Sequence, residues 1–106
     1  MSKKAIALDP YIPQTLLRDL VGHDRKPSAF LVYLHLFSES KGTRPRRVER
    51  SHETISQRTG LSKSAVQAAI RHLLWRKLLR MEKAHRTATP VYFVLKPWVR
   101  RKRIKK

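Results

Sequence analysis

The sequence contains no cysteine, which excludes disulfide bonds, thiol nucleophiles and every thiolate metal site. Acidic residues are also scarce: seven Asp and Glu stand against 25 Lys and Arg, and the formal net charge is +18. So large a positive excess predicts a polyanionic partner. The acids and the five histidines are scattered, without paired-carboxylate or metal-ligand spacing. We therefore expect no enzyme, no metal or other cofactor and no small-molecule substrate.

Long apolar runs are missing as well. The most apolar stretch, residues 29–37, is interrupted by His35 and falls short of the roughly 20 residues that a membrane span needs. The N-terminal patch of residues 5–8 ends at Asp9 and Pro10, too early for the apolar region of a signal peptide. We therefore expect no membrane partner and a cytoplasmic location.

The length and hydrophobic content favour a single folded domain with extensions. A chain of 106 residues with 41% hydrophobic side chains can bury one core and is not simply a disordered basic arm. We predict a basic arm and an accessory helix over residues 1–26, the main domain over residues 27–98, and a basic tail over residues 99–106.

The accessory helix is predicted to begin at Pro13 and to end at Gly22, since proline suits the first helical position and glycine a helix end. The apolar side of this helix can pack on the helix that contains Phe30 in the same chain or on a second copy of the chain. Because the helix lies outside the main domain and has no obligatory partner there, we expect it to support a homodimer. That apolar side consists of Leu16, Leu17, Leu20 and Val21.

The main domain shows helical and strand signals in a fixed order. A nearly all-apolar helix starts at Pro27 and is followed by the basic loop 41–50, with a short strand near Val48. Two helices follow, the first capped by Ser51 and ending at Gly60, and the second capped by Ser62. The segments 78–83 and 91–96 are rich in strand-forming residues and predict a hairpin with a basic tip.

The stretch His52–Leu73, HETISQRTGLSKSAVQAAIRHL, resembles the winged helix-turn-helix DNA-binding domains of bacterial and phage transcriptional regulators and replication initiators. The helix at 27–39 and the hairpin at 78–96 extend the resemblance to about two thirds of the chain. It implies an α+β fold that is mainly α with a small β-hairpin wing. Two positions depart from the family: Ser56 stands where Ala is usual, and Lys77 where Gly commonly precedes the wing.

The second helix of this motif has a face suited to base recognition. Its inner side is expected to carry Val66, Ile70 and Leu73, which leaves polar and small side chains outside. Gln can pair with adenine, Arg and Lys can reach guanine, and Ala can touch a thymine methyl group. The predicted base-reading residues are Lys63, Ser64, Gln67, Ala68 and Arg71.

Two further sets are predicted to contact the nucleic-acid backbone. The first, from the helices and the wing tip, comprises Thr54, Arg58, Ser62, His85, Arg86 and Thr87. The second, from the basic loop and tail, comprises Arg44, Arg46, Arg47, Arg100, Arg101, Lys102 and Arg103. The aromatic residues Trp75, Tyr92, Phe93 and Trp98 are expected to pack in the core or at its edge.

These features together predict a sequence-specific, nucleoid-associated protein that binds double-stranded DNA and regulates transcription in a prokaryotic cell. Two alternatives stay open. A plasmid or phage replication-initiation or partition protein would use the same face. A structural protein that coats nucleic acid without sequence choice would need little beyond the charge of +18.

Overall fold

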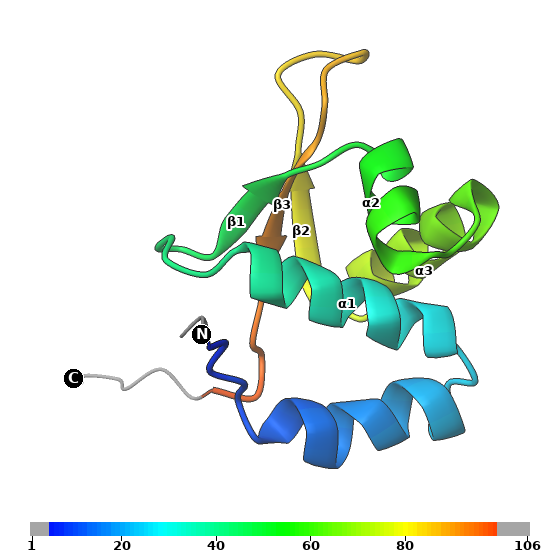
Figure 1. The fold of residues 1–106 in the computed structure, drawn as a ribbon, viewed down its shortest axis with the longest axis vertical. Helices are drawn as coiled ribbons and strands as arrows, with labels where there is room; N and C mark the ends of the chain where they lie inside the picture. Colours follow the sequence, from blue (N-terminus) through cyan, green and yellow to red (C-terminus); the bar gives the residue numbers. More distant parts are fainter. Residues whose placement is uncertain (1–4, 100–106) are drawn as a thin grey trace.

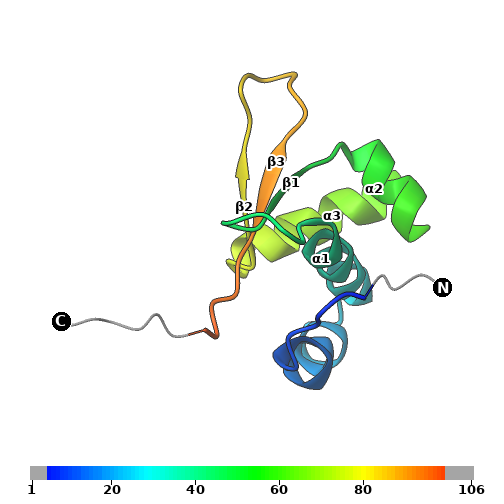
Figure 2. The same cartoon turned by 60° about the vertical axis from the view of Figure 1, so that its left-hand side comes forward.

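The computed structural model describes residues 5–99. Its elements run in the order η1 (Ile12–Leu16), η2 (Arg18–His23), α1 (Pro27–Glu39), β1 (Arg47–Glu49), α2 (His52–Thr59), α3 (Lys63–Trp75), β2 (Leu79–Glu82) and β3 (Val91–Val94). Helix α1 occupies the middle of the molecule, with η1 and η2 on one side of it and α2 and α3 on the other (Figures 1 and 2). The result is a compact α+β domain.

The helix ends follow from local sequence signals. The Ser51 side chain accepts a hydrogen bond from the Thr54 backbone N–H at the start of α2, and Ser62 does the same for Ala65 at the start of α3. Gly60 ends α2 with φ +83°, a left-handed conformation that glycine adopts without steric cost. The predicted bounds of α1 and α2 and the predicted start of α3 are confirmed.

A small antiparallel sheet, ordered β1-β3-β2, packs beside α1. Tyr92 at its centre pairs with Val48 on one side and with Met81 on the other. The predicted short strand and hairpin are confirmed. Residues 83–90 form a loop that projects well beyond the sheet (Figure 1). Lys77, just before β2, has a φ of +62°, so it adopts the conformation that glycine would take more easily.

The N-terminal helical segment belongs to the same core as the rest of the domain. It is helical where the sequence predicted, although its hydrogen bonds follow a π-helical pattern. Ile12, Leu16 and Leu20 are buried in one cluster with the side chains of α1. Of the two partners that the sequence left open, the structure shows the one within the chain: η2 packs on α1, and the apolar side joins the core. The premise that this side has no partner in the same chain is therefore wrong. Leu17 alone among the predicted four is exposed, at 40%.

The two ends of the described chain meet beside η1. The Asp9 carboxylate accepts a hydrogen bond from Trp98 Nε1 at 3.2 Å and lies 3.5 Å from Lys96 Nζ. The Trp98 ring stacks on Tyr11, with the ring centroids 4.4 Å apart. Among residues 5–99, no helix combines the length and the apolar character that a membrane crossing demands.

Candidate nucleic-acid interface

Helix α3 has one buried and one exposed side. Val66, Ala69, Ile70 and Leu73 are at most 4% exposed, and they pack toward α1 and α2. Away from this buried side, the structure places the predicted base-reading residues in contact with solvent. Lys63, Ser64, Gln67 and Arg71 are exposed, and Ala68 is half-buried.

The N-terminal end of α3 is already hydrogen-bonded locally. The Ser62 hydroxyl accepts from the Ala65 backbone N–H at 3.1 Å and lies 3.2 Å from the Ser64 hydroxyl. Lys63 Nζ is 3.9 Å from Glu53 Oε1, and both side chains are more than 60% exposed. An ion pair that is this long and this exposed contributes little to stability. Lys63 can therefore leave Glu53 and bind another anion.

The predicted backbone contacts on α2 lie beside the base of the hairpin loop. Thr54 and Arg58 line a shallow polar pocket of about 450 Å³, whose wall also includes Thr89. Arg58 Nη1 lies 3.9 Å from Glu39 Oε1, and Arg50 forms a closer ion pair with the same carboxylate. Glu39, at the end of α1, therefore holds one arginine tightly and leaves Arg58 56% exposed.

The ionisable groups around α2 are shifted by these contacts. The hydrogen bond from Arg50 lowers the pKa of Glu39, and the charges of Arg50, His35 and Arg58 act in the same direction. Burial lowers the pKa of His35, and burial together with the charge of Lys83 lowers the pKa of His52. Both histidines therefore favour the neutral form near pH 7, and the positive charge of this region comes from its Arg and Lys.

The hairpin loop carries its polar residues into solvent. His85, Arg86 and Thr87 are all exposed, and the Ala88 backbone N–H closes a turn on the His85 carbonyl at 3.0 Å. The Thr87 hydroxyl lies 3.3 Å from His85 Nδ1. The predicted tip residues thus lie together in the middle of the loop 83–90, and this loop projects beyond the sheet (Figure 2).

Arg46 differs from the expectation for a basic-loop residue. Its Nη1 donates to the Phe37 carbonyl at 2.7 Å and to the Ser40 hydroxyl at 3.2 Å, and its guanidinium carbon lies 3.8 Å from the centre of the Phe37 ring. These bonds connect the loop 41–50 to the end of α1 through Arg46. Arg44 and Arg47 are exposed as expected.

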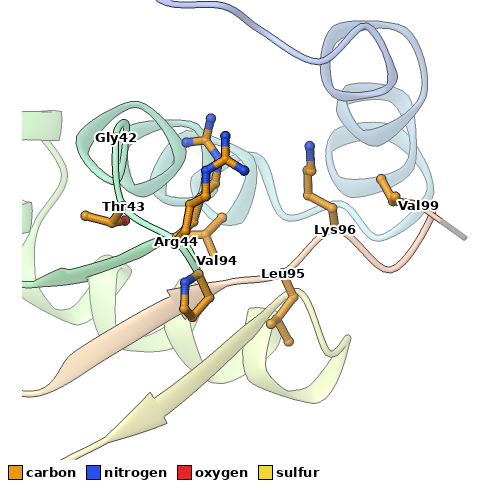
Figure 3. A pocket seen from close by; sticks show the side chains of 9 residues that line it. Gly42, Thr43, Arg44, Val94, Leu95, Lys96 and Val99 are labelled. Atoms are coloured by element: carbon orange, nitrogen blue, oxygen red, sulfur yellow. The ribbon is translucent and has the colours of Figure 1, made fainter. Parts of the chain in front are cut away.

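The same loop borders a pocket of about 600 Å³. Its other wall is the end of β3 and the residues after it, and the side chains of Arg44 and Lys96 end on the same side of it (Figure 3). The loop before β1, which lines this pocket, lies on the side of the sheet away from α2 and α3 (Figure 1). The predicted tail contacts Arg100, Arg101, Lys102 and Arg103 lie outside the described residues.

A polar cluster at the C-terminal end of α3 was not foreseen. The Asp24 carboxylate, 8% exposed, accepts hydrogen bonds from His72 Nε2 and Arg76 Nε, both at 2.8 Å, and from His23 Nδ1 at 2.9 Å. Burial raises the pKa of Asp24, but these hydrogen bonds and the charge of Arg76 outweigh it and lower the pKa to about 2. The sequence carries no signal for this contact, because Asp24 and Arg76 are 52 positions apart.

The aromatic residues divide into two groups. Tyr92 is fully buried, Phe93 is half-buried under the Arg80 guanidinium, and Trp98 is half-buried against Tyr11. Core or edge packing is confirmed for these three. Trp75 is 74% exposed, so the expectation of core packing is wrong for it. Its spacing of four residues from Arg71 could have placed it on the exposed side of α3.

Among the described residues 5–99, no three His, Asp or Glu side chains come together in a way that could hold a metal ion. Comparison with protein-family models, with curated proteins and with solved structures finds no match to this chain.

Proposed function

We propose that residues 27–98 form a winged helix-turn-helix domain that binds double-stranded DNA at specific sequences. The order helix, strand, helix, helix, hairpin supports this, together with the tight turn at Gly60 between α2 and α3. In this arrangement α3 is the recognition helix and the loop 83–90 is the wing.

The two sides of α3 carry the proposal. The buried side anchors the helix in the core, and the opposite side presents Gln67 and Arg71 one turn apart, with no acidic residue between Thr54 and Met81. In the major groove, Gln67 can pair with adenine and Arg71 with guanine, while Ser64 and Ala68 allow close approach to the bases. When its ion pair with Glu53 breaks, Lys63 can contact a further base or a phosphate.

Backbone contacts come from elements on either side of the recognition helix. Thr54 and Arg58 of α2 and the tip residues His85, Arg86 and Thr87 are exposed or half-buried polar side chains, suited to phosphate oxygens or to the minor groove. We propose that the protein regulates transcription by occupying its DNA site, in the cytoplasm and at the nucleoid. Base contacts from α3 and backbone contacts from α2 and the wing suffice for this role. No catalytic step and no cofactor enters the proposal.

Selection of bound sites from random duplexes tests the proposal directly. We expect a defined motif. On that site, Gln67→Ala and Arg71→Ala should each lose about 1 to 3 kcal/mol of binding free energy and relax preference at one or two base pairs. Gln67→Ala should leave binding to scrambled duplex unchanged, because it removes no charge.

Matched controls exist in the N-terminal helical segment. Gln14 and Arg18 are exposed on η1 and η2, on the far side of α1 from α3 (Figure 1). Gln14→Ala and Arg18→Ala should keep the selected motif and its affinity, and thermal melting checks the folding of all four variants. Equal losses on the selected and the scrambled duplex would contradict the assignment of α3 as the reader.

A second candidate function is the coating of nucleic acid without sequence choice, which the net charge of +18 favours. In that case the selection returns no motif, and affinity depends on salt and not on sequence.

A further inference from the structure

Trp75 is the most exposed of the large hydrophobic side chains among the described residues, at 74%. The chain has two tryptophans, and the other, Trp98, is stacked on Tyr11 and hydrogen-bonded to Asp9. An indole group left in water forgoes the large favourable free energy of its burial. Tryptophan is enriched at interfaces, where one end of the ring is apolar and the N–H is polar, so an exposed indole beside a candidate interface is a candidate contact.

Trp75 lies on the same side of α3 as three of the five proposed base readers, Ser64, Ala68 and Arg71. A helix turns about 100° per residue, so positions 64, 68, 71 and 75 fall within a sector of roughly 60°. The buried positions 66, 69, 70 and 73 occupy the opposite side of the helix. Trp75 thus continues the exposed stripe of Ser64, Ala68 and Arg71 by one more turn.

The surroundings of Trp75 are basic. Arg71 precedes it by one turn, and Arg76 and Lys77 follow it directly. Two acids lie near Arg76. The Asp24 carboxylate is 8% exposed and is already shared by His23, His72 and Arg76, and Asp19, which lines a pocket with Arg76, lies 3.9 Å from Arg18 Nε. A second copy of the chain would bring the same positive charge to this surface, whereas a polyanion would be attracted to it. Charge therefore favours nucleic acid over a homodimer as the occupant.

One side of the indole contacts the ring of His72. The Trp75 ring lies 5.6 Å from the ring of His72, and His72 Nε2 donates to the Asp24 carboxylate at 2.8 Å. A chain of contacts thus runs from Asp24, at the end of η2, to Trp75 at the end of α3.

We propose that Trp75 is a DNA-contacting residue that packs against the sugar-phosphate backbone at the edge of the groove occupied by α3. The apolar face of the indole covers a deoxyribose, and its Nε1–H donates to a phosphate oxygen. The proposal rests on the proposed function, since it requires a duplex bound on α3. It adds an apolar anchor to an interface otherwise built from polar and charged side chains.

Tryptophan fluorescence tests this with the chain as its own probe. In the Trp98→Phe variant, Trp75 is the sole tryptophan, and acrylamide, a neutral quencher, should reach it readily in the free protein. Saturation with the selected duplex should reduce quenching severalfold. The matched control is Trp75→Phe, which keeps Trp98 and should show the same quenching with and without DNA.

Affinity provides a second readout. Trp75→Ala should weaken binding to the selected duplex about tenfold, and Trp75→Phe, which keeps an aromatic face but no N–H, should weaken it less. Thermal melting should be unchanged in Trp75→Ala, because little of the side chain is buried.

The outcomes separate the inference from the function on which it rests. If the parent chain binds a selected duplex and Trp75 stays as accessible as before, the inference is wrong and the proposed function stands. If no selected duplex is obtained, both fail. If quenching of Trp75 decreases with protein concentration in the absence of DNA, a second copy covers the indole and the inference is overturned.

Discussion

Two basic loops of this protein use their charges differently. In the loop 41–50, Arg46 is bonded to the Phe37 carbonyl and Ser40, and Arg50 to Glu39. In the hairpin loop 83–90, the side chains of Lys83, His85 and Arg86 stand in solvent. The first loop has the larger number of cations, but part of that charge holds the loop to the end of α1.

The difference shows that the number of cations in a segment overstates the charge available to a partner. A guanidinium group that bonds backbone carbonyls inside the fold stabilises the protein, and only the remaining cations are free to neutralise phosphates. Each variant below removes either a group that bonds within the fold or a cation that is exposed to solvent. The first kind should change stability, and the second kind should change DNA affinity.

Removal of the Arg46 side chain should have the largest effect. Arg46→Ala eliminates two hydrogen bonds and the contact with the Phe37 ring, and we expect a loss of about 2 to 3 kcal/mol in the free energy of unfolding. Arg44→Ala is the matched control, two residues away and exposed, with an expected change within about 0.5 kcal/mol. Chemical denaturation measures both, and equal losses would contradict the distinction between the two arginines.

The next largest effect should come from Asp24, which connects Arg76 and His72 of the α3 end to the end of η2. Its pKa in the folded protein is about 2, below the ordinary value of 3.8. The stabilisation is therefore complete above about pH 4 and is lost as the pH falls from 4 toward 2. Asp24→Asn should remove roughly 2 kcal/mol at pH 7 and flatten the dependence of stability on pH in that window.

Asp19→Asn serves as the control for Asp24. Asp19 pairs with Arg18 at 3.9 Å on the surface, and such a pair contributes little. Denaturation of both variants at pH 7 and across pH 2 to 4 is the measurement. A pH dependence that is as steep in Asp24→Asn as in the parent chain would show that another carboxylate controls it.

The smallest effect should come from Arg86 at the hairpin tip. Arg86→Ala should leave the free energy of unfolding unchanged and reduce the slope of log affinity against log salt by about 0.9, the value for one lost phosphate contact. The preferred sequence should not change, because a backbone contact carries no base information. Binding measured across a salt series gives the slope, and a new preferred sequence after this substitution would instead make Arg86 a base reader.

The sequence by itself determined the local structure. Ser51 and Ser62 satisfy backbone N–H groups a few residues away, and Gly60 supplies a positive φ, so the ends of α2 and α3 depend on neighbouring residues alone. The exposed side of α3 follows from helical periodicity, and for that reason Lys63, Gln67 and Arg71 were placed in solvent correctly. The hairpin followed from strand-forming composition on both sides of a polar segment.

Tertiary structure decided what depends on distant contacts. The periodicity of residues 13–22 left two partners open for their apolar side, the same chain or a second one, and the structure buries Leu16 and Leu20 in the core of the same chain. Arg46 found its carbonyl acceptor nine residues back, and Asp24 its partners 48 and 52 residues ahead. Periodicity describes how one element faces its surroundings, but which element covers that face, and which charge is neutralised there, depends on how the elements pack.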